Sequence, residues 1–319
     1  MWILSEQEVK QLADEALAFD AVSQALVAAY RQNGTLNPVV IAASNKPGAS
    51  FSIKSGNLAE PAVTGVKLGG YWPGNAEHGL PNHSTATLLL EEATGLPRAL
   101  VNAGYLNGLR TAAANAVAVS ALARPDSRVL SVLGAGHQAG FEIRAVCRVR
   151  PIERVLIANR NVERAEQLAQ SLADLDLPIE VVSAEEACKT ADILVTVTNA
   201  TEPLLQAEWV PSGCHISAMG ADQGGKQELP VSLALQAECF ADRPEQSRQI
   251  GELEAAARQF PSLTIDAIGA VLSGVHPGRS SAQAITLFDS SGIAFQDLCC
   301  AEAVLQRAKA KGMGTEVAW

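Results

Sequence analysis

The spacing of apolar and polar residues changes character once along the chain, near Pro125. Residues 5–30 carry apolar side chains at helical spacing, which predicts one N-terminal helix. From residue 39 to residue 102, short apolar runs alternate with Gly, Pro and Asn, which predicts a sheet with few helices. These runs are Val39–Ala42, Phe51–Ile53, Val63–Leu68, Ser84–Glu91 and Pro97–Asn102. An Ala-rich helix is then expected from Asn107 to Ala123, with Pro125 beyond its end.

After Pro125, apolar runs of strand length alternate with segments of helical spacing. The predicted strands are Arg128–Leu133, Arg154–Ala158, Ile179–Val182, Ile193–Thr196, His215–Ala218 and Glu238–Ala241. The predicted helices are Gln138–Val149, Val162–Leu172 and Ala184–Lys189, with a further helix in the stretch Gly292–Lys311. Strands that alternate with helices form βαβ units and a parallel sheet. We therefore expect an α/β protein with a mixed α+β domain over residues 1–120 and a doubly wound domain over residues 121–292.

Composition and charge exclude several classes of protein. The chain has 319 residues, 48% of them apolar, which is enough for two domains with their own cores. No apolar run approaches the roughly 20 residues of a membrane span, and the N-terminus has no basic segment followed by an apolar core. We therefore expect a cytoplasmic protein. The net charge of -10 without blocks of like charge makes nucleic acid and anionic membranes poor partners. The six cysteines form no CxxC pair and have no His at zinc-ligand spacing, so we expect free thiols and no metal site.

A glycine-rich turn follows the first strand of the doubly wound domain. The segment from Gly134 to Ala139 fits GxGxxA between a predicted strand and a predicted helix. Gly134 permits the tight turn, Gly136 allows close approach of a pyrophosphate, and Ala139 keeps helix and strand close. The N–H groups of the helix start then face the diphosphate. The turn predicts a Rossmann dinucleotide-binding domain, although such a turn can also be merely structural. The residues expected to contact the cofactor are Gly134, Gly136, His137, Gln138, Asn159, Arg160 and Thr198.

The end of the second strand bears on the choice of cofactor. An NAD site usually has Asp or Glu there, to bind the ribose 2′-OH. This chain has neutral Asn159 followed by Arg160, and an Arg beside a neutral residue suits a 2′-phosphate. The pair favours NADP(H) slightly over NAD(H), although Arg160 can stack on adenine in either case.

Three cations lie in otherwise neutral segments of the first domain. Lys54 and Lys67 are in strand-like settings beside Gly, and Arg110 lies near the start of the Ala-rich helix. Arg can bind a carboxylate with two parallel hydrogen bonds, and Lys adds a point charge. For each residue alone, a solvated surface cation is an equally good interpretation. His83 is a further candidate to contact substrate, or a structural histidine.

One carboxylate follows a strand of the doubly wound domain. Asp222 comes shortly after His215–Ala218, and ligands of open α/β sheets bind at the carboxyl ends of strands. A turn-forming Asp is the alternative.

These residues together resemble the ornithine cyclodeaminase/μ-crystallin family over nearly the whole chain. The motifs that carry the resemblance are Gly65-Val-Lys67, Gly79-Leu-Pro81, Thr94-Gly95-Leu-Pro97, Leu109-Arg110-Thr-Ala-Ala113, Gly134-Ala-Gly-His-Gln138, Gly220-Ala-Asp222 with Lys226 and Glu228, Gly251-Glu252-Leu, and Ser291-Gly292 with Ala294 and Asp297. The family implies a Rossmann domain and a substrate domain that residues 293–319 complete and that dimerises through its sheet. It also implies that Lys67 and Arg110 bind the substrate carboxylate and that Asp222 faces the substrate nitrogen. Lys54 matches a basic position found in only some members.

The resemblance leads to a specific expectation of function. We expect NAD(P)H-dependent reduction of the C=N bond of a small α-imino acid, either a cyclic ketimine such as pyrroline-2-carboxylate or iminosuccinate. Asp222, Lys67 and Arg110 are the expected catalytic residues, and Lys54, Lys67, Arg110 and His83 the expected substrate ligands. One alternative is an ornithine or lysine cyclodeaminase that recycles its NAD, which the departure at Asn159-Arg160 disfavours. Another is a binding protein that holds NADP and a ligand without turnover.

Overall fold

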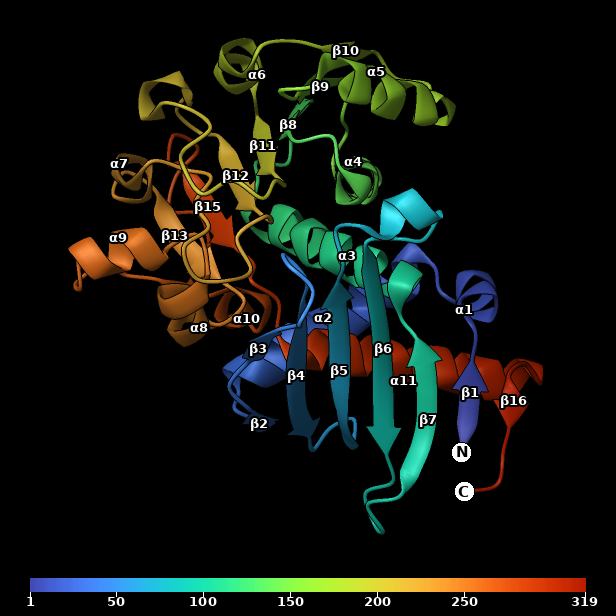
Figure 1. Cartoon of the computed structure of the whole chain (residues 1–319). Helices are drawn as coiled ribbons and strands as arrows, with labels where there is room; N and C mark the ends of the chain where they lie inside the picture. The colour runs from blue at the N-terminus through green and yellow to red at the C-terminus, as the bar shows by residue number, and fades with distance from the viewer. The chain divides into compact units, whose positions relative to one another are not determined.

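The computed structural model describes residues 1–319, which fold into two compact units. The first unit comprises Met1–Arg110 and Ile293–Trp319, and the second comprises Thr111–Gly292. The domain boundary expected at residue 120 falls inside helix α3 (Gly104–Leu122), which begins in the first unit and continues into the second (Figure 1). None of the helices combines the length and apolar character that crossing a membrane requires.

The first unit is built on an eight-stranded sheet with the order β16-β1-β7-β6-β5-β4-β2, in which β3 also pairs with β4. Strands β4 to β7 form an antiparallel meander, and β1 adds to β7 in parallel. The strands are β1 (Trp2–Leu4), β2 (Gly34–Leu36), β3 (Val40–Ala43), β4 (Ser50–Leu58), β5 (Val63–Tyr71), β6 (His83–Leu90), β7 (Pro97–Asn102) and β16 (Thr315–Glu316). The C-terminal helix α11 (Ala294–Lys311) packs on β4 to β7 and on α2 (Glu15–Tyr30), so the last residues of the chain complete the core of this unit.

The expected single helix over residues 5–30 is wrong in one respect. The structure has two helices, α1 (Glu6–Leu12) and α2, separated by two extended residues, Ala13 and Asp14. The Asp14 side chain accepts a hydrogen bond from the backbone N–H of Leu17 at 2.8 Å and so begins a new helix. The helical spacing continues across the break because both helices bury their apolar sides in the same core.

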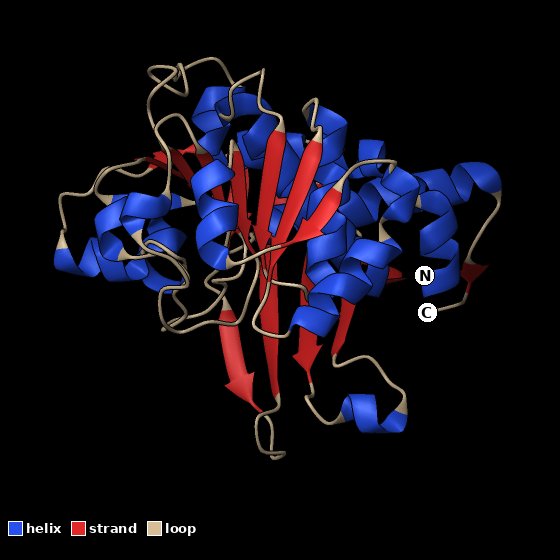
Figure 2. Ribbon diagram, turned by 90° about the horizontal axis from the view of Figure 1, so that it is seen from above, coloured by secondary structure: helices blue, strands red, loops and turns tan.

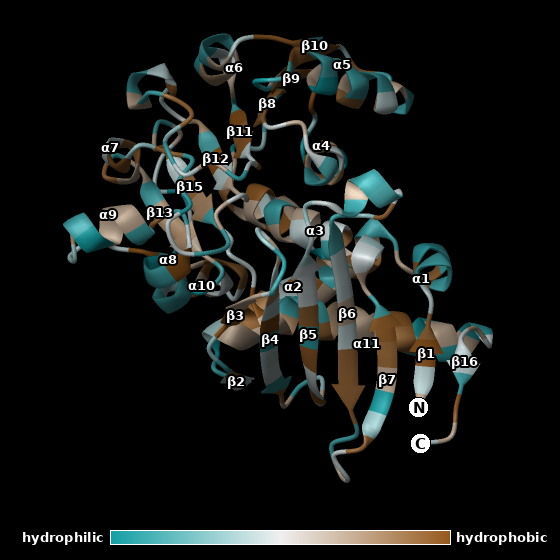
Figure 3. Ribbon diagram, viewed as in Figure 1, coloured by the Kyte–Doolittle hydropathy of each residue, from teal (hydrophilic) through white to brown (hydrophobic).

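The second unit is a parallel sheet with the order β10-β9-β8-β11-β12-β15-β13-β14. The strands are β8 (Val129–Leu133), β9 (Arg154–Ala158), β10 (Ile179–Val181), β11 (Ile193–Thr196), β12 (His215–Ala218), β13 (Glu238–Ala241), β14 (Asp266–Ala267) and β15 (Thr286–Asp289). The order reverses between β8 and β11, which is where ligands bind in sheets of this kind. Strands β8 and β11 are largely brown in Figure 3 because most of their side chains are apolar. The predicted α/β fold class is confirmed.

Helices cover the second sheet, and Figure 2 distinguishes them in blue from the red strands. They are α4 (His137–Val149), α5 (Val162–Ser171), α6 (Ala184–Thr190), α7 (Val231–Ala234), α8 (Pro244–Ile250), α9 (Glu254–Gln259) and α10 (Ile268–Leu272), with 3-10 turns at Asn75–His78 in the first unit and at Ala173–Leu175 and Ala207–Trp209 in the second. Helices α6, α7 and α9 share one apolar cluster with the sheet, which includes Cys188, Leu233, Ala256 and Leu287. The sequence patterns did not predict β14, β15 or helices α7 to α10.

Candidate functional site

A row of buried polar side chains crosses the sheet of the first unit. Lys54 on β4 lies directly opposite Lys67 on β5, and Lys67 lies opposite Thr87 on β6. The exposed fractions of the three residues are 7%, 6% and 1%. Two like charges directly opposite each other repel, and burial removes the water that would screen them. The row is therefore stable only with anionic or hydrogen-bonding groups beside it.

Helix α3 brings Arg110 to this row. The Nη2 of Arg110 donates to Asn107 Oδ1 at 2.7 Å, and the Nζ of Lys67 donates to the same oxygen at 2.8 Å. The Nη1 of Arg110 donates to Oε1 of Gln296, from α11, at 3.2 Å. The sequence patterns predicted Lys54, Lys67 and Arg110 separately, and the fold gathers them into one cluster.

The next residue of α11, Asp297, supplies the negative charge of the cluster. Its Oδ1 lies 3.1 Å from Nε of Arg110 and 3.7 Å from Nζ of Lys67. Burial acts to raise the pKa of Asp297, but Arg110, Lys67 and Lys54 outweigh burial and hold this pKa below its ordinary value of 3.8. With Asp297 ionised, three cations face one anion, so the cluster suits a ligand that carries negative charge.

Of the remaining predicted site residues, His83 lies apart from this cluster, at the other end of the β5–β6 pairing. His83 is exposed at the first position of β6, where its ring centroid lies 4.7 Å from that of Tyr71. Asp222 belongs to the second unit, and its role stays a prediction. The Oδ1 of Asp222 accepts from Nζ of Lys226 at 2.6 Å, and the side chain of Asp222 is 58% exposed.

The glycine turn has the conformation that a dinucleotide requires. Gly134 has a φ of 123°, and a Cβ there would lie 2.7 Å from the carbonyl oxygen of Val197, so only glycine fits. Gly136 is the N-cap of α4 and makes no side-chain cap, and a Cβ added to it would meet no atom within 4 Å. The turn therefore leaves open space at a helix N-terminus, as a bound diphosphate needs.

The other predicted cofactor residues follow neighbouring strands of the same sheet. Asn159 and Arg160 follow β9, and the Asn159 amide donates to the carbonyl of Asn161 at 2.8 Å, while Arg160 is exposed. Thr198 follows β11, and its Cγ2 would lie 3.0 Å from a Cβ on Gly134. Gly134 and Thr198 are thus neighbours at the point where the strand order reverses. The residues present fit a nicotinamide dinucleotide.

A buried carboxylate holds the ends of β11 and β12 together. Oε1 of Glu228 accepts from the backbone N–H and the hydroxyl of Thr198 at 2.7 and 2.8 Å. Its Oε2 accepts from the hydroxyl of Thr196 at 2.8 Å and from the N–H of Gly220 at 3.0 Å. Burial raises the pKa of Glu228 and these hydrogen bonds oppose the rise. Glu228 therefore fixes the loop that carries Thr198.

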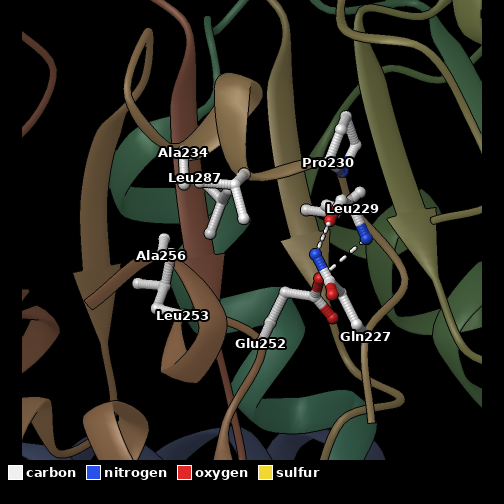
Figure 4. A pocket seen from close by; sticks show the side chains of 9 residues that line it. Gln227, Leu229, Pro230, Ala234, Glu252, Leu253, Ala256 and Leu287 are labelled. Atoms are coloured by element: carbon white, nitrogen blue, oxygen red, sulfur yellow. Dashed lines mark hydrogen bonds between the residues drawn. The ribbon is translucent and has the colours of Figure 1, made fainter. Parts of the chain in front are cut away.

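A second buried acid, Glu252, lines a small pocket with Leu229, Leu253 and Leu287 (Figure 4). The Glu252 carboxylate accepts from the backbone N–H groups of Glu228 and Leu229, the shortest of these bonds being 2.7 Å. Its oxygens are thus engaged with the backbone, and the rest of the lining is largely apolar. This pocket is part of the support behind Glu228 and not a candidate substrate site.

A parallel sheet with a dinucleotide turn at its switch point defines the chain as a Rossmann-fold protein of the dinucleotide-binding class. The ornithine cyclodeaminase/mu-crystallin family matches residues 2–312, and the chain belongs to this family. The resemblance stated from the sequence motifs is thereby confirmed.

Relatives of known activity share the whole length of the chain. The iminosuccinate reductase of Paracoccus denitrificans is 39% identical over 319 residues, 99% of each protein. Its crystal structure in complex with NAD+ has a TM-score of 0.94 and covers 100% of this chain and 99% of that one. The structure of Thermococcus litoralis Δ1-pyrroline-2-carboxylate reductase with NADH and L-proline also has a TM-score of 0.94, at 28% identity, covering 99% of this chain and 100% of that one. An archaeal alanine dehydrogenase dimer with bound NAD has the same TM-score at 33% identity, covering 100% and 99%.

Asn107, Gln296 and Asp297 are the site residues that reasoning from the sequence did not assign. Asp297 belonged to a family motif, but nothing suggested its role. The sequence offered one indication of these residues. The start of the C-terminal helix is apolar at Ala294, Phe295 and Leu298, as in a buried helix, yet it also contains an amide and an acid.

Proposed function

We propose that this chain is an NAD(P)H-dependent reductase that converts the C=N bond of a small α-imino acid into the C–N bond of an amino acid. The buried cluster of Lys54, Lys67 and Arg110 carries the proposal, in a chain whose other unit has a dinucleotide turn. Similarity over the full length to two reductases of imino acids and to an alanine dehydrogenase supports the proposal.

Each residue of the proposed mechanism has a separate task. Lys67 and Arg110 bind the α-carboxylate, and the contacts of Arg110 with Asn107 and Gln296 hold its guanidinium in one orientation. Bound NAD(P)H supplies a hydride to the imine carbon. Asp222 delivers the proton that the nitrogen gains, and its charge stabilises a protonated iminium.

The charge of the cluster favours a substrate with two carboxylates. Lys54, Lys67 and Arg110 are buried within one cluster, and each is a cation that a carboxylate can pair with. A dianionic imine such as iminosuccinate can reach all three through its two carboxylates, whereas a cyclic monocarboxylic ketimine has a single carboxylate to share among them. We assign the second carboxylate to Lys54.

The first test is a spectrophotometric panel. NADH and NADPH oxidation is followed with iminosuccinate, pyrroline-2-carboxylate, piperideine-2-carboxylate, and pyruvate with amines. The proposal expects oxidation of reduced cofactor that depends on the imine. Ammonia release from ornithine or lysine without net change in cofactor would instead identify a cyclodeaminase. Cofactor binding without any turnover would identify a binding protein.

Replacement of Lys54 tests the substrate class. Lys54→Ala should raise KM for iminosuccinate about tenfold or more, because it loses a charged contact, and should change KM for pyrroline-2-carboxylate little. Lys46→Ala, which removes an exposed lysine before β4, is the matched control. Equally small changes in KM for both substrates would show that Lys54 does not bind a second carboxylate and has a structural role.

Neutral Asn159 and exposed Arg160 support NADP(H) slightly over NAD(H) as the cofactor. No carboxylate is present at the end of β9 to repel a 2′-phosphate, and Arg160 can pair with one. The relatives' structures contain NAD+, NADH and NAD, so the comparison of the two cofactors belongs in the first kinetic experiment.

We also propose that the chain forms a homodimer through the open face of the first sheet. Val66, Leu88 and Leu100 lie side by side across β5, β6 and β7, and Leu100 is 37% exposed. Leu68, the second residue along β5 from Val66, is 48% exposed. Apolar side chains grouped in this way are typical of interfaces. Light scattering coupled to gel filtration should give twice the chain mass, and Leu68→Glu should lower it.

A further inference from the structure

Asp297 touches both cations that are proposed to bind the substrate carboxylate. One oxygen, Oδ1, lies 3.1 Å from Nε of Arg110 and 3.7 Å from Nζ of Lys67. Asp297 is 3% exposed and lies in the first turn of α11, where the helix dipole favours negative charge. Its carboxylate is therefore a fixed part of the cluster and not a mobile surface group.

The contacts around Arg110 define the plane of its guanidinium. Nη1 donates to Gln296 and Nη2 donates to Asn107, while Nε lies 3.1 Å from Oδ1 of Asp297 in an ion-pair contact that is not a hydrogen bond. A planar group contacted on three of its edges cannot rotate without losing a contact. Asp297 is the only charged member of the three, so its contact is the one that depends most on ionisation.

Two buried atoms of the same helical turn have no hydrogen-bond partner. They are Oδ2 of Asp297 and Nε2 of Gln296, in residues that are 3% and 0% exposed. Buried polar atoms in folded proteins almost always have a partner. The first turn of α11 is therefore completed by a ligand or by water.

The charge of Asp297 also limits the charge of the cluster. Lys54, Lys67 and Arg110 together carry three positive charges, and Asp297 cancels one of them. Without the charge of Asp297, the cluster would be more positive and a dianion would be attracted more strongly. Excess attraction is unproductive, because it holds product as well as substrate.

We propose that Asp297 is the positioning and charge-limiting residue of the anion site: it orients Arg110 and Lys67 and lowers the positive charge that a bound anion meets. Gln296 takes part through its unpartnered Nε2, which donates to the bound anion. This inference rests on the proposed function for its kinetic consequences, but not for its consequences on anion binding.

Calorimetric titration of the full chain with succinate and with propionate tests the charge. Asp297→Asn keeps the size of the side chain and removes its charge, so succinate should bind about tenfold more tightly, with a smaller gain for propionate. Glu302→Gln, which removes another acid of α11 that is paired with Arg98, is the control and should leave both affinities unchanged. Weaker or unchanged succinate binding in Asp297→Asn would overturn the proposal, and so would a wild type that binds no succinate.

Kinetics with the dicarboxylic imine test the positioning. Asp297→Asn should lower kcat about 100-fold while KM falls. The variant binds the anionic substrate more tightly, but Arg110 and Lys67 no longer hold it in the orientation that the reaction requires. Asp297→Glu keeps the charge and displaces it, so kcat should fall while succinate affinity stays within about twofold of wild type. A folded Asp297→Glu enzyme with the wild-type kcat would overturn the positioning role even if Asp297→Asn failed to fold. Tighter succinate binding in Asp297→Asn together with no imine reduction in wild type would refute the proposed function and leave the anion site standing.

Discussion

The buried carboxyl group of Asp289, at the end of β15, predicts how the stability of the second unit depends on pH. Burial raises the pKa of Asp289 to about 7, against hydrogen bonds from Ser247 and Leu253 that lower it and with Asp242 adding to the rise. Its Oδ2 accepts from Ser247 Oγ and from the backbone N–H of Leu253 at 3.2 Å, whereas its Oδ1 has no partner.

An unfolded Asp has a pKa of about 3.9. Between pH 4 and pH 7 the folded chain therefore keeps a proton that the unfolded chain has released. The contribution of this group to stability is complete below about pH 4 and is lost as the pH rises through 7. Three pKa units correspond to about 4 kcal/mol, of which about 3 kcal/mol falls between pH 5 and pH 8.

Asp289→Asn removes this titration at small structural cost. The amide nitrogen takes the position of the unpartnered Oδ1, and the amide oxygen keeps the two hydrogen bonds. From pH 5 to pH 8, the free energy of unfolding of wild type should fall about 3 kcal/mol more than that of the variant. Urea titration at four pH values measures the difference. Asp126→Asn, at an exposed position, should follow wild type. Parallel pH profiles for wild type and Asp289→Asn would refute the reasoning.

Three further predictions concern the reaction and its cofactor. Arg110→Ala should lower kcat/KM by a factor that corresponds to about 2–5 kcal/mol, because it removes a charged contact, and Arg110→Lys should lower it as well, since an ammonium cannot reproduce the planar contacts of a guanidinium; wild-type kinetics in folded Arg110→Ala would exclude Arg110 as the carboxylate ligand. Asp222→Asn should leave cofactor affinity intact and lower kcat by about 10²–10⁴, and a folded variant with normal kcat and a lowered melting temperature would instead make Asp222 a turn residue. Asn159→Asp should shift kcat/KM toward NADH by repelling a 2′-phosphate, and a wild type that already prefers NADH by about tenfold, or 1.4 kcal/mol, would contradict the preference for NADP(H).

Sequence patterns predicted strands β8 to β13 of the second unit because apolar residues predominate or alternate with polar ones in each short run. Strands β9, β11, β12 and β13 have the expected bounds. Strand β15 was not predicted, since its four residues begin with Thr286 and end with Asp289 in a stretch rich in Ser and Gln. All four are buried because β15 lies between β12 and β13, a long-range pairing that local spacing does not encode.

The residues of the candidate site also fall into those that a local sequence motif indicates and those that only the fold brings together. The glycine turn has a local signature, and Lys67 and Arg110 each stand in a short motif. That Lys54 faces Lys67 depends on the register of β4 against β5, which no motif specifies. Asp297 could not be assigned a role from the sequence, because an acid in the first turn of a helix is ordinarily explained by the helix dipole. Its contacts exist only because α11 returns to strands and a helix from the first third of the chain.

Transfer of deuterium tests most directly whether this chain reduces a carbon–nitrogen double bond. NADH and NADPH that carry deuterium at both positions of C4 of the nicotinamide are incubated with the full chain and iminosuccinate, and the amino acid product is analysed by mass spectrometry. The proposed reaction predicts one deuterium bound to the α-carbon, in an amount equal to the reduced cofactor consumed. Product without deuterium, or no product while the cofactor binds, would contradict it.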